Sequence, residues 1–421
     1  MSLRKTAIAL GVAIFGSGVM LFGKELVSPL TWERCVSIAL QQNPDLASAR
    51  AGKEASVYSY RGSYNGILPS VTLSNSVTES NGSDPAQWQA EASANLNIID
   101  ASAIAGIKSA SAQVGQAEAR QRLASSQLRL DLRRAFLRRL FDDEDIEVSL
   151  NIQALRHKSA ELVALRYASG RESKGNRLRA EAQNLQATAE LAQARRRIRA
   201  DQRELYRQLG WGNVDDTPVQ GALSVDEPPA LLPPLSPVVE KRPDVLLQEA
   251  SVNVAQADVK RAKSPLWPTV SAGYSRFRRG ESEFPSDESG WIFRGLLDYP
   301  LFGGGLTSTY YNVAESQKNL EKANRALQSI RDQAMADLET AWSAYATAAE
   351  NTRVQAALLA AARQRNAEAD IRYNSGLLSY DNWEIIITDR VNQERQAIQS
   401  QLTAATAQAV WEFALGKTLE E

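Results

Sequence analysis

Apolar residues recur every three or four positions through two long, proline-free parts of the chain. The spacing is clearest in segments 107–140 and 310–346, which are otherwise rich in alanine and charged residues. It is typical of amphipathic helices, and no proline falls between residues 86 and 217 or after Pro300. At about 1.5 Å per residue, the two longest helices would each extend roughly 100 Å, several times the size of a globular domain. The pattern predicts helices over residues 102–168, 174–210, 306–374 and 380–416.

A different period precedes each of the two longest helices. Residues 88–98, WQAEASANLNI, place Trp88 and Leu96 on one face and Glu91 and Asn95 on the other. Residues 291–302, WIFRGLLDYPLF, alternate in a similar way. This two-residue period predicts strands, and a weaker candidate precedes each of them across a loop with turn-forming residues. The expected strands cover residues 69–80, 88–99, 268–279 and 290–302.

The length of these strands and the aromatic residues near their ends are typical of strands that cross an outer membrane. A small soluble sheet with one polar face is the alternative that the strands alone leave open. Four strands do not close a barrel, and an unpaired edge in lipid leaves backbone groups without hydrogen-bond partners. If the strands cross a membrane, several chains must therefore share one barrel.

The chain contains an internal duplication. Asn43-Pro44-Asp45 is matched by Arg242-Pro243-Asp244, and a further proline follows each of these prolines after 25 residues. The pentapeptides RYASG (166–170) and RYNSG (372–376) come next, and a Leu-Gly pair ends 40 residues after each pentapeptide glycine. Between the halves, residues 213–238 contain six prolines and no helical period, which indicates a linker. The two repeats are expected over residues 31–212 and 239–421.

Composition removes several classes of function. The 48 Lys and Arg residues nearly balance the 49 Asp and Glu residues, so no overall charge attracts nucleic acid. The single cysteine, Cys35, and the single histidine, His157, leave no disulfide framework, no Cys or His metal site and no catalytic dyad or triad. We therefore expect no catalytic residues, no cofactor and no metal. Cys35 is interpreted as a small apolar helix residue and His157 as a helix-surface residue.

The N-terminus has the form of an export signal. Arg4 and Lys5 precede an apolar run that ends at Phe22, as in a secretory signal peptide. We interpret residues 1–23 as this signal, with an uncleaved anchor as the alternative. The residues before Cys35 are Trp-Glu-Arg rather than the small residues that precede a lipid-modified cysteine, so no lipid anchor is expected.

Taken in order, these landmarks resemble the TolC family of bacterial outer-membrane efflux proteins over essentially the whole mature chain. The resemblance rests on LTWERCVSIALQQNPDL (30–46), LLDYPLFGGGL (296–306), the paired RYxSGxxS segments and the Leu-Gly ends. It implies an all-α arrangement of long, coiled-coil-like helical hairpins, with two internal repeats and four strands contributed to a trimeric, 12-stranded transmembrane β-barrel. It also implies a homotrimer in contact with outer-membrane lipid, with a helical tunnel in the periplasm.

The same resemblance gives the pentapeptides a place. They would form the tips near residues 170 and 376, where an outgoing helix reverses into a returning one. Gly170 and Gly376 would supply the permissive backbone, and Ser173 and Ser379 could cap the returning helices. The resemblance implies that these four residues contact a periplasmic adaptor protein.

It further implies a pore gate at Tyr373. In better-known members of the family the gate tyrosine bonds an acidic residue six positions after the first tip glycine, but here that position is Asn176. Leu378 likewise replaces an expected basic residue. The expected acidic ring falls on two uncharged residues, and Asp381 and Glu384, each one position earlier, are predicted to replace it because they share a helix face.

The implied function is that of an outer-membrane channel-tunnel, the passive exit duct of a tripartite efflux or secretion system. It would be opened by docking to a periplasmic adaptor and an inner-membrane transporter, and it would bind no nucleic acid. The alternative is a soluble periplasmic helical-hairpin structural protein without a pore. The first pentapeptide continues with basic RESKGNRLR and the second with acidic LLSYDNWE, which predicts that the first tip mainly docks an adaptor and the second guards the pore.

Overall fold

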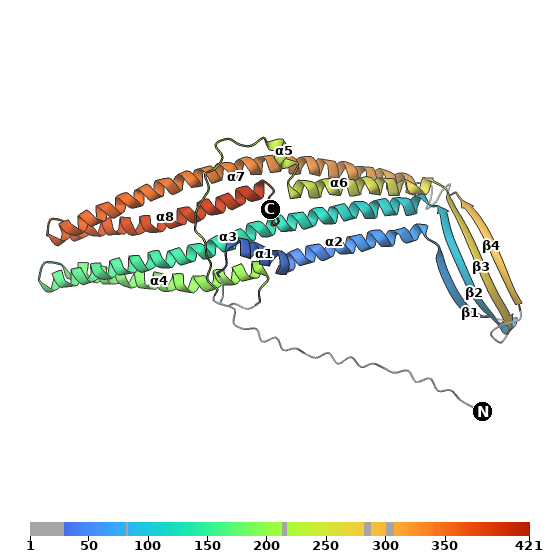
Figure 1. Cartoon of the computed structure of the whole chain (residues 1–421), viewed down its shortest axis with the longest axis horizontal. Helices are drawn as coiled ribbons and strands as arrows, with labels where there is room; N and C mark the ends of the chain where they lie inside the picture. Colours follow the sequence, from blue (N-terminus) through green and yellow to red (C-terminus); the bar gives the residue numbers. More distant parts are fainter. Residues whose placement is uncertain (1–28, 81–82, 213–216, 282–287, 300–306) are drawn as a thin grey trace, which may run out of the picture.

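The structure is a computed structural model that describes every residue except 1–28, 81–82, 213–216, 282–287 and 300–306, so the expected signal peptide lies outside the described residues. The two halves contain the same elements in the same order (Figure 1). The first half consists of α1 (Trp32–Gln42), α2 (Pro44–Ser63), β1 (Ser70–Ser80), β2 (Ser83–Ile99), α3 (Ala101–Ala168) and α4 (Lys174–Leu209). The second consists of α5 (Leu235–Val239), α6 (Pro243–Ala262), β3 (Thr269–Glu281), β4 (Glu288–Asp298), α7 (Ser308–Asn374) and α8 (Tyr380–Ala414).

The long helices predicted from the apolar spacing are confirmed. Helices α3 and α7 contain 68 and 67 residues. Figure 1 shows two helical hairpins, α3 with α4 and α7 with α8, that point the same way and lie side by side. On the half nearer the sheet, α2 packs on α3 and α6 packs on α7. Contacts of α3 with α6 and α8 join the two repeats into one elongated body.

The four strands form one antiparallel sheet in the order β1-β2-β3-β4, at the end of the molecule opposite the hairpin tips (Figure 1). Paired residues share a face, and Leu73 pairs with Ala92 while Tyr274 pairs with Phe293. The predicted alternation is confirmed, because Leu73 and Phe293 are 81% and 66% exposed on one face. That face also carries Arg276, which pairs with Ala92 and Trp291. Glu91 lies on the opposite face, which is lined largely by polar residues. Strand β4 ends at Asp298, and positions 300–302 of the predicted strand lie outside the described residues.

The repeated glycines share one local structure. Gly170, Gly210, Gly376 and Gly416 all have φ between 73° and 83°, a region that residues with a Cβ rarely adopt. Each ends a long helix. At the first tip, the N–H of Gly170 donates to the carbonyl of Tyr167 and that of the next residue donates to the carbonyl of Arg166, the Schellman arrangement that closes a helix C-terminus.

The Leu-Gly ends of the repeats pack against the repeats' own Pro-Asp starts. A Cβ on Gly210 would lie 2.2 Å from the carbonyl oxygen of Gln42, and one on Gly416 would lie 3.1 Å from the Cδ of Pro243. Asn43 adds a hydrogen bond from its Nδ2 to the carbonyl of Gln208, at 2.8 Å. The Pro-Asp start and the Leu-Gly end of each repeat are far apart in the sequence but touch in the structure. This contact explains why both features occur in both repeats.

Buried apolar residues gather in three clusters along the helices. One joins α1, the middle of α3, the end of α4 and the C-terminal segment. A second lies toward the tips, and a third holds α5 and α6 against α7 and α8. The proline-rich connection between the repeats contributes to the first cluster, because Leu223 is buried there and Val219 forms a β-bridge with Leu30. It packs on the helices as well as joining them.

The two singular residues lie as expected. Cys35 is fully buried on α1, where burial raises the pKa of its thiol to about 12. His157 is on the surface of α3, 3.3 Å from Glu161. Within the described residues, no three His, Cys, Asp or Glu side chains are grouped so as to hold a metal ion. None of the described helices combines the length and apolar character needed to span a membrane.

Candidate functional site: the paired hairpin tips

The two tips are built alike but capped differently. Ser173 is the N-cap of α4, and its Oγ accepts a hydrogen bond from the N–H of Asn176 at 3.1 Å, as predicted for a helix cap. Ser379 occupies the same position before α8, yet its side chain makes no capping hydrogen bond. Gly170 and Gly376 are open to solvent, with no atom within 4 Å of where a Cβ would be. The tip glycines are therefore required by backbone conformation and not by crowding.

Tyr373 is the most tightly held residue of the second tip. Its side chain is 1% exposed, and its ring stacks on that of Trp383 with centroids 4.1 Å apart and planes 10° from parallel. The hydroxyl donates to Oε2 of Glu172 at 2.9 Å. From the first hairpin, Arg166 lies 4.4 Å from the ring centroid and donates to the Tyr373 carbonyl oxygen at 2.5 Å. Burial, reinforced by Glu172, raises the pKa of Tyr373, so the hydroxyl stays protonated and remains a donor.

Glu172 is the partner of Tyr373 that the sequence prediction missed. The expected acidic position holds Asn176, whose Nδ2 instead donates to Oε1 of Glu172 at 2.7 Å and orients the carboxylate. Partial burial raises the pKa of Glu172, but hydrogen bonds from Asn176, Tyr373 and the Ser173 N–H outweigh it and lower the pKa overall. The sequence does contain a signal for this residue, because Glu172 is the one acidic residue in the otherwise basic stretch RESKGNRLR.

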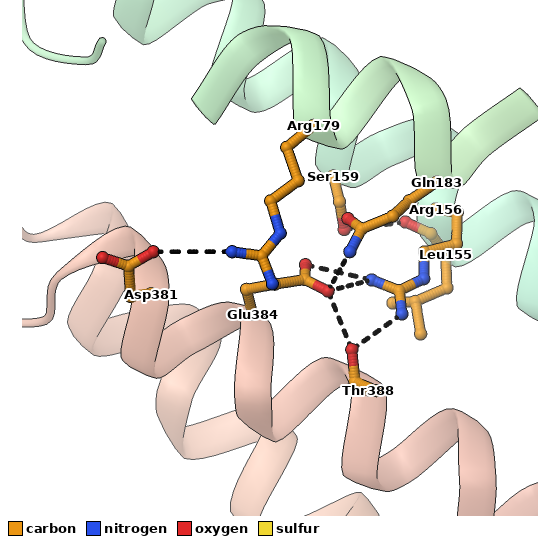
Figure 2. A network of polar contacts seen from close by, with 8 residues as sticks. All are labelled: Leu155, Arg156, Ser159, Arg179, Gln183, Asp381, Glu384 and Thr388. Atoms are coloured by element: carbon orange, nitrogen blue, oxygen red, sulfur yellow. Dashed lines mark hydrogen bonds and ion pairs between the residues drawn. The ribbon is translucent and has the colours of Figure 1, made fainter. Parts of the chain in front are cut away.

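A second connection between the hairpins centres on Glu384 of α8 (Figure 2). Its carboxylate is 2% exposed and accepts two hydrogen bonds from Arg156 of α3, at 2.9 and 3.0 Å. Gln183 of α4 donates to it at 2.5 Å and Thr388 at 2.8 Å. Arg156 also donates to Thr388, so the group is a closed polar network. Each oxygen of this buried carboxyl group therefore has a hydrogen-bond donor, and the group binds α8 to both helices of the first hairpin.

Asp381 lies three residues before Glu384 but in a different environment. Its side chain is 74% exposed, and its nearest cation, on Arg179 of α4, is 3.8 Å away (Figure 2). The two acidic residues predicted to act together are thus separated by the structure. Glu384 points into the interior of the chain against Arg156, whereas Asp381 is at the surface.

The tips therefore form two distinct parts. The solvent-exposed turns contain Gly170, Ser173, Gly376 and Ser379. Behind them, an interior layer joins α7 and α8 to α3 and α4 through Tyr373 and Glu384. This geometry defines a pair of long helical hairpins that are fastened to each other near their free ends, with a two-faced sheet at the far end of the molecule.

Comparison with known proteins identifies the class. The outer membrane efflux protein family matches residues 35–211 and 235–416, so both repeats are covered and the chain belongs to this family. The family is one of channel proteins, and the resemblance to TolC-type proteins is confirmed.

Individual relatives are distant in sequence but close in fold. The outer membrane protein OprJ of Pseudomonas aeruginosa is 27% identical over 158 residues, which is 35% of this chain and 32% of OprJ, so the chain spans about a third of that relative. The Campylobacter jejuni CmeC outer membrane channel has a TM-score of 0.82 at 14% identity, covering 99% of this chain and 95% of CmeC. The open state of the Neisseria gonorrhoeae MtrE outer membrane channel has a TM-score of 0.81 at 20% identity, covering 92% of this chain and 89% of MtrE.

Proposed function

We propose that this chain is the passive exit duct of a tripartite efflux or secretion system in the bacterial outer membrane. In this proposal residues 1–23 direct export, the repeats 31–212 and 239–421 build the duct, and residues 213–238 link them. The main support for this proposal is that the chain combines a two-faced sheet with a stack of helices about 100 Å long. It does so as a member of the outer membrane efflux protein family.

The sheet supports an assembly of three chains. Strands β1 and β4 each pair on one side only, so a single sheet has two open edges. Its apolar face exposes Val71, Leu73, Phe293 and Leu297, which are 66% to 81% exposed in the single chain. Edge-to-edge pairing of sheets from identical chains would satisfy the edges and turn this face to lipid. The face with Glu91 would then line the aqueous interior.

The inner tip contacts support a gate. Opening the tip requires α7 and α8 to move away from α3 and α4, and the hydrogen bond from Tyr373 to Glu172 opposes this movement. The buried pair of Glu384 and Arg156 opposes it more strongly, because separating the two would leave a carboxylate without its main partner. We therefore interpret the structure as the closed conformation. Asp381, being exposed, is assigned a place at the entrance rather than in the latch.

Channel formation is tested with the full-length protein. It should fractionate with the outer membrane, require detergent for extraction, and produce discrete conductance steps in a planar lipid bilayer. The alternative, a soluble periplasmic structural protein, predicts release with the soluble periplasmic fraction and no conductance. That outcome would refute the duct.

The exposed turns are assigned to the adaptor, with an inner-membrane transporter behind it. Because the only native cysteine, Cys35, is fully buried, engineered surface cysteines can be labelled selectively. Arg171→Cys and Leu377→Cys, next to the tip glycines, should crosslink to a periplasmic protein in cells. Lys318→Cys, exposed near the sheet end of α7, is the matched control. Equal crosslinking from all three positions, or from Lys318→Cys alone, would contradict docking at the tips.

A further inference from the structure

A cluster of three carboxyl groups and one guanidinium lies between α3 and α4, well away from the tip contacts. Arg197 of α4 donates from Nε to Asp142 at 2.8 Å and from Nη2 to Asp145 at 2.6 Å. Asp201, one turn further along α4, is 3.9 Å from the same Nε. At about 1.5 Å per residue, Asp142 is roughly 40 Å along α3 from the tip glycine.

Two oxygen atoms in this cluster have no donor. Oδ2 of Asp142 and Oδ2 of Asp201 are both buried, and neither accepts a hydrogen bond from any N–H or O–H group of the described residues. Asp142 as a whole is 0% exposed. Both carboxyl groups approach the same atom, since Nε of Arg197 lies 2.8 Å from Oδ1 of Asp142 and 3.9 Å from Oδ2 of Asp201. A side-chain hydrogen bond with Asp201 also contributes to the raised pKa of Asp142. If both were ionised, two acceptors would face each other across a buried contact.

The remaining charged groups nearby do not supply the missing positive charge. Arg139, the other buried cation of this region, donates to Gln202 and pairs with the exposed Asp143. Arg197 is shared among three carboxyl groups and also lies 5.4 Å from the Phe141 ring. With every carboxyl ionised, the cluster of Arg197 and its three acidic partners would therefore carry a net charge of about −2 in a partly dry environment, which is strongly unfavourable.

We propose that Asp142 and Asp201 hold one proton between them, forming a carboxylic acid–carboxylate pair that fastens α4 to α3. The shared proton supplies the donor that both unpartnered oxygens lack and reduces the negative charge facing Arg197 by one. It makes this contact a proton-binding site within the helical stack, and it does not depend on the function proposed for the tips.

The pKa of Asp142 lies in the neutral range. Burial raises the pKa of Asp142 to about 7; the hydrogen bond from Arg197 opposes this shift and the one with Asp201 adds to it. Because this pKa is higher folded than unfolded, the stabilising contribution is fully present below about pH 4 and is lost as the pH rises through about 7. The contact between α3 and α4 is accordingly tighter in mildly acidic than in alkaline solution.

Infrared spectroscopy of the full-length protein in detergent tests the shared proton directly. The difference spectrum between about pH 6 and about pH 9 should contain the C=O band of a buried protonated carboxylic acid that disappears at the higher pH. This band should be absent from both Asp142→Asn and Asp201→Asn. Asp131→Asn, a partly exposed position on α3, is the control and should leave the band unchanged. Absence of the band in the wild-type protein, or its persistence in both variants, would overturn the proposal.

Amide hydrogen exchange gives an independent readout. Protection factors for residues around 142 on α3 and 201 on α4 should fall by up to about tenfold per pH unit as the pH rises from about 4 to about 7. Asp142→Asn, whose amide mimics the protonated acid, should remain protected across this range. Protection in the wild-type protein that does not change with pH, or a variant that keeps the full pH dependence, would refute the pair.

Discussion

The buried pair of Glu384 and Arg156 makes the sharpest prediction about the proposed gate. In Glu384→Gln the shape of the side chain is retained but the charge is lost, and an amide NH2 group faces Arg156. Breaking a buried ion pair by altering one partner costs roughly 3–5 kcal/mol. The pair qualifies as buried, because the side chain of Arg156 is 8% exposed and that of Glu384 is 3% exposed. Because Gln can still accept from Gln183 or Thr388, we take the lower limit, about 3 kcal/mol.

If this energy holds the hairpins together only in the closed state, its loss shifts the closed-to-open equilibrium by roughly 100-fold. The assay is the open probability of single channels in planar bilayers, without any partner protein. Glu384→Gln should raise this probability strongly. Combining it with Arg156→Met should add much less than the sum of the two single effects, because the two residues act through one contact.

The control lies on the same helix. Asp381→Asn also removes one acidic charge from α8, but its ion pair with Arg179 is exposed and 3.8 Å long, so the effect should stay below about 1 kcal/mol. An open probability unchanged in Glu384→Gln, despite a lower melting temperature, would mean that the pair stabilises both states equally and is no latch. Equal opening by Asp381→Asn would refute the argument from burial.

Three further predictions concern single residues. Tyr373→Phe keeps the ring in place but removes the hydroxyl's hydrogen bond, worth about 1 kcal/mol, so the open probability should rise roughly fivefold in the same assay. Gly210→Ala should destabilise the protein by several kcal/mol in denaturant unfolding, because its Cβ would lie 2.2 Å from a carbonyl oxygen, whereas Gly170→Ala, with free space around it, should cost about 1 kcal/mol from backbone strain alone. Cys35, fully buried and with its pKa raised to about 12, should react with thiol reagents only on unfolding, as followed by mass spectrometry.

The sequence predicted the long helices and the strands well because their signals are local. Apolar spacing and the absence of proline extend over dozens of residues in α3 and α7, and strand alternation depends only on neighbours in sequence. Duplication added a second, independent copy of each signal. The left-handed glycines at 170 and 376 were predicted for the same reason, since a helix reversal needs a permissive backbone wherever it occurs.

The contacts between side chains of the two repeats could not be predicted from local sequence signals. Tyr373 and Glu172 are 201 residues apart, and Glu384 and Arg156 are 228 apart. Which side chains meet depends on how the two hairpins are rotated about their axes, and apolar spacing alone leaves this angle open in alanine-rich helices. The expected acidic position, 176, is four residues after the actual partner: Asn176 lies in the first turn of α4, whereas Glu172 lies in the tip before the helix, where Asn176 orients it.

The duplicated tips keep one geometry and use it for different contacts. Tyr167 in the first pentapeptide corresponds to Tyr373 in the second, and position 177 corresponds to position 383, at the same offset of 206 residues. Arg177 lies over the ring of Tyr167 at 5.0 Å, just as Trp383 stacks on Tyr373. The residue ten positions after the pentapeptide tyrosine therefore covers that ring in both copies, by a cation–π contact in one and by aromatic stacking in the other.

The two pentapeptide tyrosines differ in burial. Tyr167 is 38% exposed, whereas Tyr373 is buried and is contacted by Arg166 and Glu172 of the first tip. The tyrosine of the contact comes from the second repeat and its charged partners come from the first, so neither repeat contains the whole contact. In the gate proposed above, a contact assembled in this way would depend on the relative position of the two hairpins, which is the property that a gate between them requires.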